Sequence, residues 1–320
     1  MNDPSMVTLL AVVFGALVLG SIAAAIVART ARSDRGRSMA RNLAARMRSW
    51  WIMAGVFVAS VLIGGVGTIV LFAASSFLAF REFITLTPTR RGDHRALFWA
   101  FFFVIPIQYL LVAQERYGLF SIFIPVYAFI LIPARIAAAG ETESFLERTS
   151  KIQWGLLSCV YFVSHVPAIL TLDIPGSETS NAALLFFLVL IVQLNDVFQY
   201  IVGSLFGRRP LAPRVSPNKT IEGMIGGLVG SVAVGAAMST VTPFGVAGAA
   251  GLAAAIAVMG VLGDLTMSAV KRDLGVKDYS DLIPGHGGVL DRLDSLTFAA
   301  PVFFHLTRYF YSGDGMTAIV

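Results

Sequence analysis

Residues 6–28 read MVTLLAVVFGALVLGSIAAAIVA and contain no charged side chain. At a rise of about 1.5 Å per residue, a helix of this length crosses a hydrocarbon core roughly 30 Å thick. The rest of the 320-residue chain has the same character: 56% of the residues are hydrophobic, 13% are charged, and the mean hydropathy is +0.76. A chain this apolar cannot cover a globular surface with polar groups. The sequence therefore predicts an all-α, polytopic integral membrane protein.

A basic segment follows this first span directly. Residues 29–48 hold seven arginines against Asp34, a net charge of +6 in a chain whose total is +5. Because basic loops stay in the cytoplasm, we expect a cytoplasmic loop here, an N-terminus outside, and a retained anchor in place of a cleaved signal peptide. Charge concentrated in one loop gives no support to nucleic-acid binding. The arginines are Arg29, Arg32, Arg35, Arg37, Arg41, Arg46 and Arg48.

The apolar stretch 50–80 is too long for one upright span. It contains Gly64, Gly65 and Gly67 near its middle, and the segment after it is again arginine-rich. Two basic loops on the same side require an even number of crossings. We therefore predict two short helices that turn at the glycines, with one long tilted helix as the alternative.

Seven further spans are expected, which gives about ten helices with both termini outside. Short loops leave no room for a separate soluble catalytic domain, so any chemistry must be built from helix ends and loops at the cytoplasmic face. The spans are residues 96–113, 119–138, 152–172, 182–202, 223–242, 244–263 and 295–311.

Common soluble-enzyme chemistries find no support in the sequence. Cys159 is the only cysteine, which excludes an internal disulfide and a Cys-based metal site. Gly-x-Ser-x-Gly, His-Glu-x-x-His and a Gly-x-Gly-x-x-Gly in a strand context are all missing from the chain. Hydrolase, zinc protease and dinucleotide-binding functions are therefore not favoured.

Two short segments hold most of the lysines. In the first, Ser216, Lys219 and Thr220 come just before a glycine-rich helical pattern. Free backbone N–H groups and the helix dipole favour an anion there, so the segment is a candidate phosphate site, although it lacks the Walker spacing. The alternative is an ordinary capped helix, with Glu222 as a first-turn acid.

The second segment, 263–295, is densely charged. On a helix, Asp264, Ser268 and Lys271 fall at i, i+4 and i+7 and share one face, while Asp291 and Asp294 share a face of the last helix. Three carboxylates close together repel unless a cation is present, and oxygen ligands suit Mg²⁺. In the alternative reading the acids pair with nearby cations in a solvated loop. These cations are Arg272, Lys277 and Arg292.

Two further features have a functional and a structural interpretation. His286 lies in the turn formed with Gly287 and Gly288, where missing side chains let backbone approach a ligand, but a lone His between glycines is more often only a turn residue. Asn195 and Asp196 end an apolar span. An acid there is costly enough to suggest a role, unless it reaches the membrane interface.

Together these residues resemble the phosphatidate cytidylyltransferases, also called CDP-diacylglycerol synthases. The resemblance is strong over about residues 180–310 and loose over about 50–180, and the segment around Asn195, Asp196, Tyr200 and Gly203 is also similar. Departures occur at Asn218, at Ile221 and at residues 197–199. The main motif is Ser268-x-x-Lys271-Arg272-x-x-x-x-Lys277-Asp278-x-Ser280-x-x-Ile283-Pro284-x-His286-Gly287-Gly288-Val289-x-Asp291-Arg292-Leu293-Asp294, and the second is Ser216-Pro217-x-Lys219-Thr220-x-Glu222-Gly223.

The resemblance implies Mg²⁺-dependent transfer of CMP from CTP to phosphatidate. A second metal ion is left open. It implies that Asp264, Asp291 and Asp294 hold metal and that Lys271, Arg272, Asp291 and Asp294 are catalytic. The implied nucleotide-binding residues are Ser216, Lys219, Thr220, Glu222, His286, Gly287 and Gly288. Further candidates are Asp196, Ser268, Lys277, Asp278 and Arg292. The chain divides on this basis into an anchor with its basic loop (1–49), N-terminal membrane helices (50–180) and a catalytic membrane domain (181–320).

The expected partners are CTP, phosphatidate and the lipid bilayer, with a homodimer left open and no nucleic acid. The expected location is the bacterial inner membrane, with the active site on its cytoplasmic face. One alternative keeps CTP but changes the acceptor to an isoprenoid phosphate or a polyprenol. Another alternative is a lipid transporter. The charged residues argue against it, because they cluster at one face and not at the midplane of the membrane.

Overall fold

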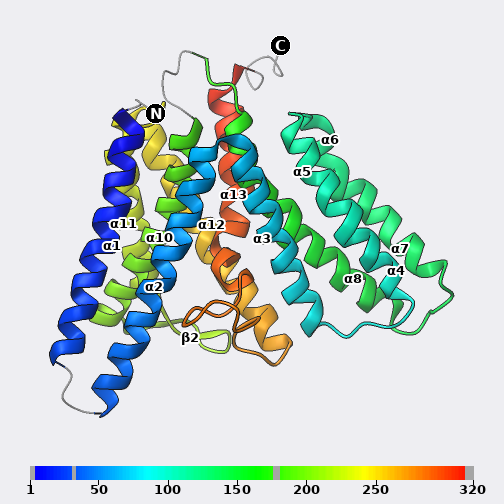
Figure 1. The fold of residues 1–320 in the computed structure, drawn as a ribbon, viewed down its shortest axis with the longest axis horizontal. Helices are drawn as coiled ribbons and strands as arrows, with labels where there is room; N and C mark the ends of the chain where they lie inside the picture. The colour runs from blue at the N-terminus through cyan, green and yellow to red at the C-terminus, as the bar shows by residue number, and fades with distance from the viewer. Residues whose placement is uncertain (1–3, 31–33, 176–180, 314–320) are drawn as a thin grey trace.

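The computed structural model describes residues 4–30, 34–175 and 181–313, and these form a bundle of long helices (Figure 1). The predictions made for the N-terminus and for Arg32 lie outside the described residues. The α-helices are α1 (Pro4–Thr30), α2 (Asp34–Ile63), α3 (Gly65–Leu86), α4 (Asp93–Trp99), α5 (Ile105–Ala113), α6 (Tyr117–Ile122), α7 (Phe129–Ala137), α8 (Phe145–Leu156), α9 (Phe162–Ala168), α10 (Asn181–Phe206), α11 (Ile221–Ala237), α12 (Val246–Asp273) and α13 (Leu290–Tyr311).

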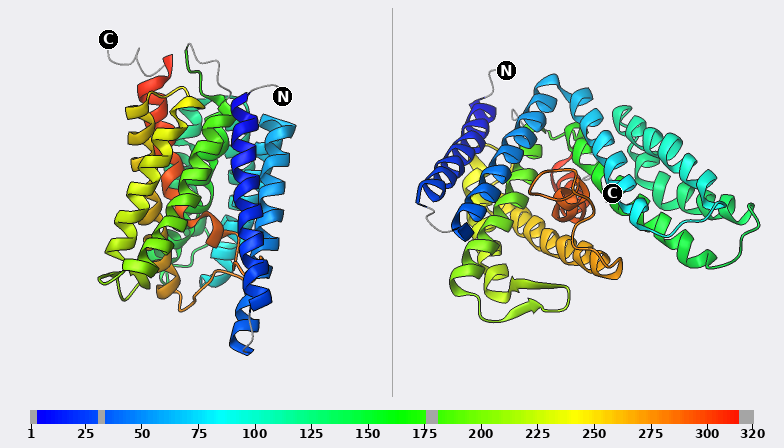
Figure 2. Two further views of the ribbon diagram at one scale, coloured as in Figure 1. Left: turned by 90° about the vertical axis from the view of Figure 1, so that its left-hand side faces the viewer. Right: turned by 60° about the horizontal axis from the view of Figure 1, so that its bottom comes forward.

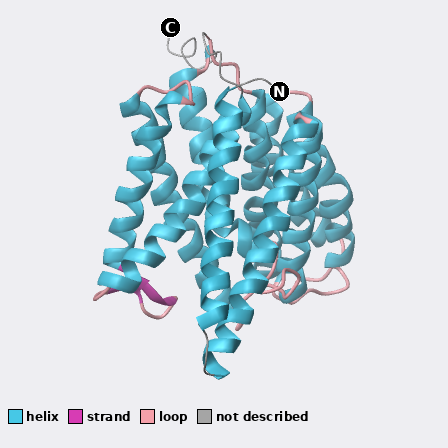
Figure 3. Ribbon diagram, turned by 60° about the vertical axis from the view of Figure 1, so that its left-hand side comes forward, coloured by secondary structure: helices cyan, strands magenta, loops and turns pink. Residues whose placement is uncertain are grey.

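Short helical segments of other types continue several of these helices. The π-helical segments η1 (Ala100–Val104), η2 (Phe123–Ala128) and η3 (Leu157–Tyr161) run between α4 and α5, α6 and α7, and α8 and α9. The 3₁₀ segments η4 (Ile169–Thr171) and η5 (Met238–Thr240) follow α9 and α11. Strands β1 (Pro210–Ala212) and β2 (Ser216–Thr220) pair as a small antiparallel hairpin at one end of the bundle (Figure 3).

Within the described residues, nine helical stretches are long and apolar enough to cross a membrane. They include the predicted pair within 50–80 and six of the seven later spans. The remaining prediction, 295–311, lies in α13, which is not among the nine but runs through the bundle beside α12 (Figure 1). The protein is thus a polytopic helical membrane protein, as the sequence predicts.

The helical pair within 50–80 confirms the prediction of two crossings, but the helices are not short. The chain breaks at Gly64, whose φ of +103° is strained for any residue with a side chain. A Cβ at Gly67 would lie 2.5 Å from the Ser60 carbonyl oxygen, so glycine also lets α2 and α3 approach closely. The helices are 30 and 22 residues long, because α2 begins far before residue 50 and α3 continues to Leu86.

The expected loop over residues 29–48 is wrong for most of its length. Arg29 lies in the last turn of α1, and Arg41, Arg46 and Arg48 lie in α2. Arginine is a good helix former, and one glycine in this segment does not outweigh the helix that continues into the apolar part of α2. The basic residues therefore extend a helical hairpin beyond the other helix ends (Figures 1 and 2).

Successive long helical stretches alternate in direction, so that α1 begins and α13 ends at the same end of the bundle (Figure 1). The opposite end carries the start of α2, the β1–β2 hairpin and residues 274–289, and we call it the basic end. This arrangement agrees with the even number of crossings that the charge pattern requires. It also brings both lysine-containing segments to one place.

Glycines allow the helices of the C-terminal half to pack closely. A Cβ at Gly227 of α11 would lie 2.5 Å from Gln199 Cγ of α10, and a Cβ at Gly263 of α12 would lie 2.6 Å from the Asp294 carbonyl oxygen of α13. Small residues at such contacts are the usual means of close helix packing in membranes. The result is that the polar ends of α10, α11, α12 and α13 converge.

Candidate active site

The first lysine segment forms the β1–β2 hairpin and the start of α11. Thr220 is the N-cap residue of α11, and its Oγ1 accepts a hydrogen bond from the Gly223 N–H at 3.1 Å. The Glu222 carboxylate accepts the N–H groups of Arg208 and Arg209 at 3.0 and 3.1 Å. The capped-helix interpretation is therefore confirmed for Thr220 and Glu222. Lys219 belongs to strand β2 and comes directly before the N-cap residue.

Lys219 forms an ion pair with Asp264 of α12, so that the two lysine segments contact each other. Ser268 donates from Oγ to Asp264 Oδ1 at 3.1 Å, which confirms that these two residues share a helix face. Ser216, at the start of β2, is half-buried and lies on the same hairpin. The hairpin and α12 are thus joined through a lysine and an aspartate from the predicted set.

A second ion pair joins α12 to α13. Lys271 Nζ lies 2.7 Å from Asp291 Oδ1, with side chains only 10% and 1% exposed, and 3.9 Å from Asp294 Oδ2. The other oxygen of Asp291, Oδ2, accepts the N–H groups of Tyr279 at 2.8 Å and Gly288 at 2.9 Å. Asp291 therefore both neutralises Lys271 and fixes the loop before α13.

The two ion pairs belong to one charged cluster, which we define as Lys219, Lys271, Asp264, Asp291 and Asp294. The charge on Asp294 interacts with Asp264 and with Asp196 of α10. Ser295 of α13 donates from Oγ to Asp196 Oδ2 at 3.5 Å, so Asp196 borders the cluster. Three separate helices thus bring together the acids that the sequence indicates, and the hairpin adds Lys219.

The cations that the alternative interpretation paired with these acids have other surroundings. Arg272 donates from Nε to the Val215 carbonyl oxygen at 3.2 Å and from a terminal nitrogen to the Val276 carbonyl oxygen at 3.0 Å. Arg292 is exposed, and its charge influences Asp294 and Asp196. Lys277 and Asp278 are exposed on the loop after α12. The acids pair with Lys219 and Lys271, and so the solvated-loop interpretation is wrong for them.

No group of three Asp, Glu, His or Cys side chains within the described residues is arranged to hold a metal ion. Asp264, Asp291 and Asp294 nevertheless supply the oxygen donors that Mg²⁺ prefers. Lysine ammonium groups contact all three, although the contact with Asp294 is long. The donor chemistry therefore fits a hard divalent cation, with the lysines as the positive charges that neutralise these acids here.

The turn at His286 is held against α2. Gly285 and Gly287 both have φ above +70°, and a Cβ at Gly287 would lie 2.8 Å from Asp291 Oδ2. The His286 ring meets the Trp50 ring edge-on at a centroid distance of 6.0 Å. Burial, followed by the charge of Arg292, lowers the pKa of His286 below its usual value. This shift favours the neutral imidazole, and α2 contributes directly to the site.

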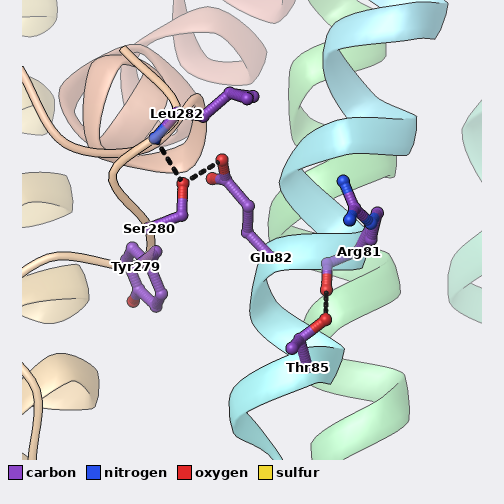
Figure 4. A pocket seen from close by; sticks show the side chains of 6 residues that line it. All are labelled: Arg81, Glu82, Thr85, Tyr279, Ser280 and Leu282. Carbon is purple, nitrogen blue, oxygen red and sulfur yellow. Dashed lines mark hydrogen bonds between the residues drawn. The ribbon is translucent and has the colours of Figure 1, made fainter. Parts of the chain in front are cut away.

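Residues outside the predicted set also shape this loop. Ser49 of α2 donates from Oγ to the Pro284 carbonyl oxygen at 2.8 Å. Glu82 of α3 accepts hydrogen bonds from Ser280 and from the start of α13. Glu82 lines a pocket of about 220 Å³ between α3 and the loop (Figure 4). For Glu82 the sequence offers one signal of a role, which is a carboxylate at the end of an apolar span.

The fold and the site define a class. Lysines and aspartates from several helices gather at one end of a polytopic bundle, which is the arrangement expected of a membrane enzyme that handles anionic groups. The model of the cytidylyltransferase family matches residues 44–310, and the chain belongs to this family. The protein is thus a membrane-embedded nucleotidyltransferase.

Individual relatives agree with this assignment. The uncharacterized protein YnbB of Escherichia coli (strain K12) is 38% identical over 270 residues, which cover 82% of this chain and 87% of the relative. A phosphatidate cytidylyltransferase of Brucella abortus biovar 1 (strain 9-941) is 31% identical over 280 residues, or 87% and 98% of the two chains. A phosphatidate cytidylyltransferase of Aquifex aeolicus (strain VF5) is 36% identical over 165 residues, or 51% and 58%.

Proposed function

We propose that this protein transfers CMP from CTP to phosphatidate and releases pyrophosphate, in a Mg²⁺-dependent reaction at the cytoplasmic face of the bacterial inner membrane. The observation that carries the proposal is the charged cluster at the basic end, where Lys219 pairs with Asp264 and Lys271 pairs with Asp291. The relatives that are named phosphatidate cytidylyltransferases support the choice of acceptor.

The reaction requires little acid–base chemistry. A phosphate oxygen of phosphatidate attacks the α-phosphorus of CTP, a new P–O–P bond forms, and the bond to the β-phosphate breaks as pyrophosphate leaves. A phosphate monoester has a second pKa near 6, so the nucleophile is already ionised at neutral pH. A site without a Ser–His pair is therefore adequate for this chemistry.

The main difficulty is to bring two polyanions together, and the cluster suits that task. Lys219 and Lys271 would hold phosphate oxygens, because each lies near the end of a strand or helix and contacts an aspartate of the cluster. Asp264, Asp291 and Asp294 would hold Mg²⁺. A bound Mg²⁺ would neutralise charge that develops on the phosphates during transfer.

The position of the cluster also suits a lipid acceptor. Lys271 lies in the last turn of α12, and Asp291 and Asp294 lie near the start of α13, where the headgroup of a lipid sits while its acyl chains stay in the bilayer. The transporter alternative loses support because the chain belongs to a nucleotidyltransferase family. A different acceptor, such as an isoprenoid phosphate or a polyprenol, is an outcome of the test below.

The test is pyrophosphate release from CTP by the purified protein in detergent, with and without phosphatidate, and with Mg²⁺ or EDTA. We expect release that needs both phosphatidate and Mg²⁺, the appearance of CDP-diacylglycerol, and its loss in Asp294→Asn. A matched control is Asp281→Asn, which changes an exposed loop aspartate. Release with an isoprenoid phosphate and not with phosphatidate would change the acceptor. Full activity of Asp294→Asn would refute its place in the metal site.

A further inference from the structure

Glu82 is a carboxylate near the end of a membrane helix, and three donors converge on it. The residue is only 6% exposed. Oε1 accepts hydrogen bonds from Ser280 Oγ at 2.7 Å and from the Val289 N–H at 3.0 Å, and Oε2 accepts the Leu290 N–H at 2.9 Å. Glu82 is about 200 residues away from these partners in sequence, so the contacts tie α3 to the C-terminal half of the chain.

Two of these donors belong to the start of α13, which carries the Asp291 and Asp294 motif. The first N–H groups of a helix have no partners within that helix. Val289 occupies the N-cap position, where its apolar side chain supplies no hydrogen-bond acceptor. Glu82 takes this role from another helix, and its negative charge suits the positive end of the α13 dipole.

Glu82 and Asp291 bind neighbouring residues of the same loop. Asp291 binds the N–H groups of Tyr279 and Gly288, while Glu82 binds the next residue in each place, Ser280 before the turn and Val289 after it. Each carboxylate therefore bridges the two sides of the turn at 283–287. A shift of the loop away from Glu82 would also move the partners of Asp291.

The space around Glu82 is limited on one side and open on the other. A Cβ at Gly288 would collide with the Glu82 carboxylate, so a side chain there would displace the carboxylate from its present position. On the other side lies the pocket of about 220 Å³ between α3 and residues 279–282 (Figure 4). Across this pocket the Glu82 side chain reaches Ser280 directly, as the dashed line in Figure 4 marks.

We propose that Glu82 is a positioning residue of the transferase site: it caps α13 and fixes the loop at residues 279–289, and so places Asp291 against Lys271. The proposal rests on the proposed function for its effect on turnover. Glu82 places Asp291 from outside the charged cluster, to which it does not belong.

The chemistry predicts a difference between glutamate and glutamine. A carboxylate offers acceptors only, which matches three converging donors. In Glu82→Gln one oxygen becomes an NH₂ group, so a donor must face either the Leu290 N–H or the Ser280 and Val289 pair. The volume is unchanged, and the loss is confined to the hydrogen bonds.

The experiment compares Glu82→Gln with Thr85→Val, which alters another residue of the same pocket on the same helix. Turnover with CTP and phosphatidate, thermal unfolding, and hydrogen exchange of peptides over residues 279–290 are measured for both. For Glu82→Gln we expect kcat to fall by about 10- to 100-fold, with a much smaller change in the KM for CTP, because misplacement of reacting groups by about 1 Å costs this much. Exchange should rise within residues 279–290 and not elsewhere. Thr85→Val should resemble the wild type.

Unchanged kcat and unchanged local exchange in Glu82→Gln, with an active wild type, would overturn the proposal. A general rise in exchange with early unfolding of the whole protein would also overturn it, because Glu82 would then act only in overall stability. If Glu82→Gln does not fold, Ser280→Ala removes one donor alone. This variant should show a smaller loss of kcat and a rise in exchange in the same loop. An inactive wild type would refute the proposed function, and the exchange measurement would still decide the role of Glu82 in holding the loop.

Discussion

The Lys271–Asp291 ion pair gives a prediction that can be worked out from its geometry. The two charges are 2.7 Å apart, with side chains 10% and 1% exposed, and each residue comes from a different helix. We compare Lys271→Met, Asp291→Asn and the double variant. Among the described residues, Lys271→Met leaves a buried carboxylate with two backbone N–H donors. Asp291→Asn leaves the ammonium with Asp294, at 3.9 Å, as its acidic contact within the same part of the chain.

Coulomb's law gives an attraction of about 6 kcal/mol for two unit charges 2.7 Å apart at an effective dielectric constant of about 20. The loss of hydration on burial offsets part of this attraction. Removing one partner of a buried pair typically costs about 3–5 kcal/mol, because the other charge stays buried without its partner. We therefore expect each single variant to lose about 3–5 kcal/mol of unfolding free energy. The double variant should be more stable than the sum of the two losses predicts, by about 2 kcal/mol or more.

The assay is reversible unfolding in mixed micelles, followed by tryptophan fluorescence, for the four proteins of the cycle. Lys277→Met is the matched control, since Lys277 is exposed six positions further along the chain, and it should change stability by less than about 0.5 kcal/mol. Losses in the single variants that add up in the double variant to within about 0.5 kcal/mol would refute the reasoning. Such additivity would mean that the two side chains do not stabilise each other.

Two further changes test other parts of the site. Thr220→Ala should destabilise α11 by about 1 kcal/mol through loss of its N-cap, and Thr220→Ser should restore it; equal unfolding free energies for the Ala and Ser variants would contradict the cap. Because burial lowers the pKa of His286, the unfolded chain binds its proton more readily than the folded protein. The contribution of His286 is therefore fully present above about pH 6.5 and is lost as the pH falls below that value. The stability of the wild type relative to His286→Gln should decrease on acidification, and an increase would show that the sign is wrong.

Several features could be predicted from sequence because they depend on local pattern. Apolar runs of about 20 residues identify spans, and the positions of the arginines fix the parity of crossings, which is why the break at Gly64 was expected. Helix spacing placed Asp264 and Ser268 on one face, as the hydrogen bond between them confirms. The pattern underestimates the length of α2, since a helix continues past the apolar run until the chain offers a reason to stop.

The pairing of charges could not be predicted in this way. The sequence offered Arg272, Arg292 and Lys277 as neighbours of the acids, yet Lys219 pairs with Asp264 across 45 positions of chain. That choice depends on how closely α10, α11 and α12 pack, and hence on glycines whose role appears only when a neighbouring helix is in place. Glu82 was overlooked for the same reason, because its partners lie about 200 residues away.

The sequence by itself determined that this protein is a helical membrane protein, on which side of the bundle its basic segments meet, and which residues carry the cytidylyltransferase motifs. These properties follow from hydrophobic length, charge distribution and residue spacing, which are local in the chain. Only the tertiary structure decided which lysine neutralises which aspartate, that α2 and α3 hold the loop before α13, and that a carboxylate from α3 caps that helix. Hydrogen bonds and ion pairs act over about 3 Å, so they depend on which helix ends the packing brings together.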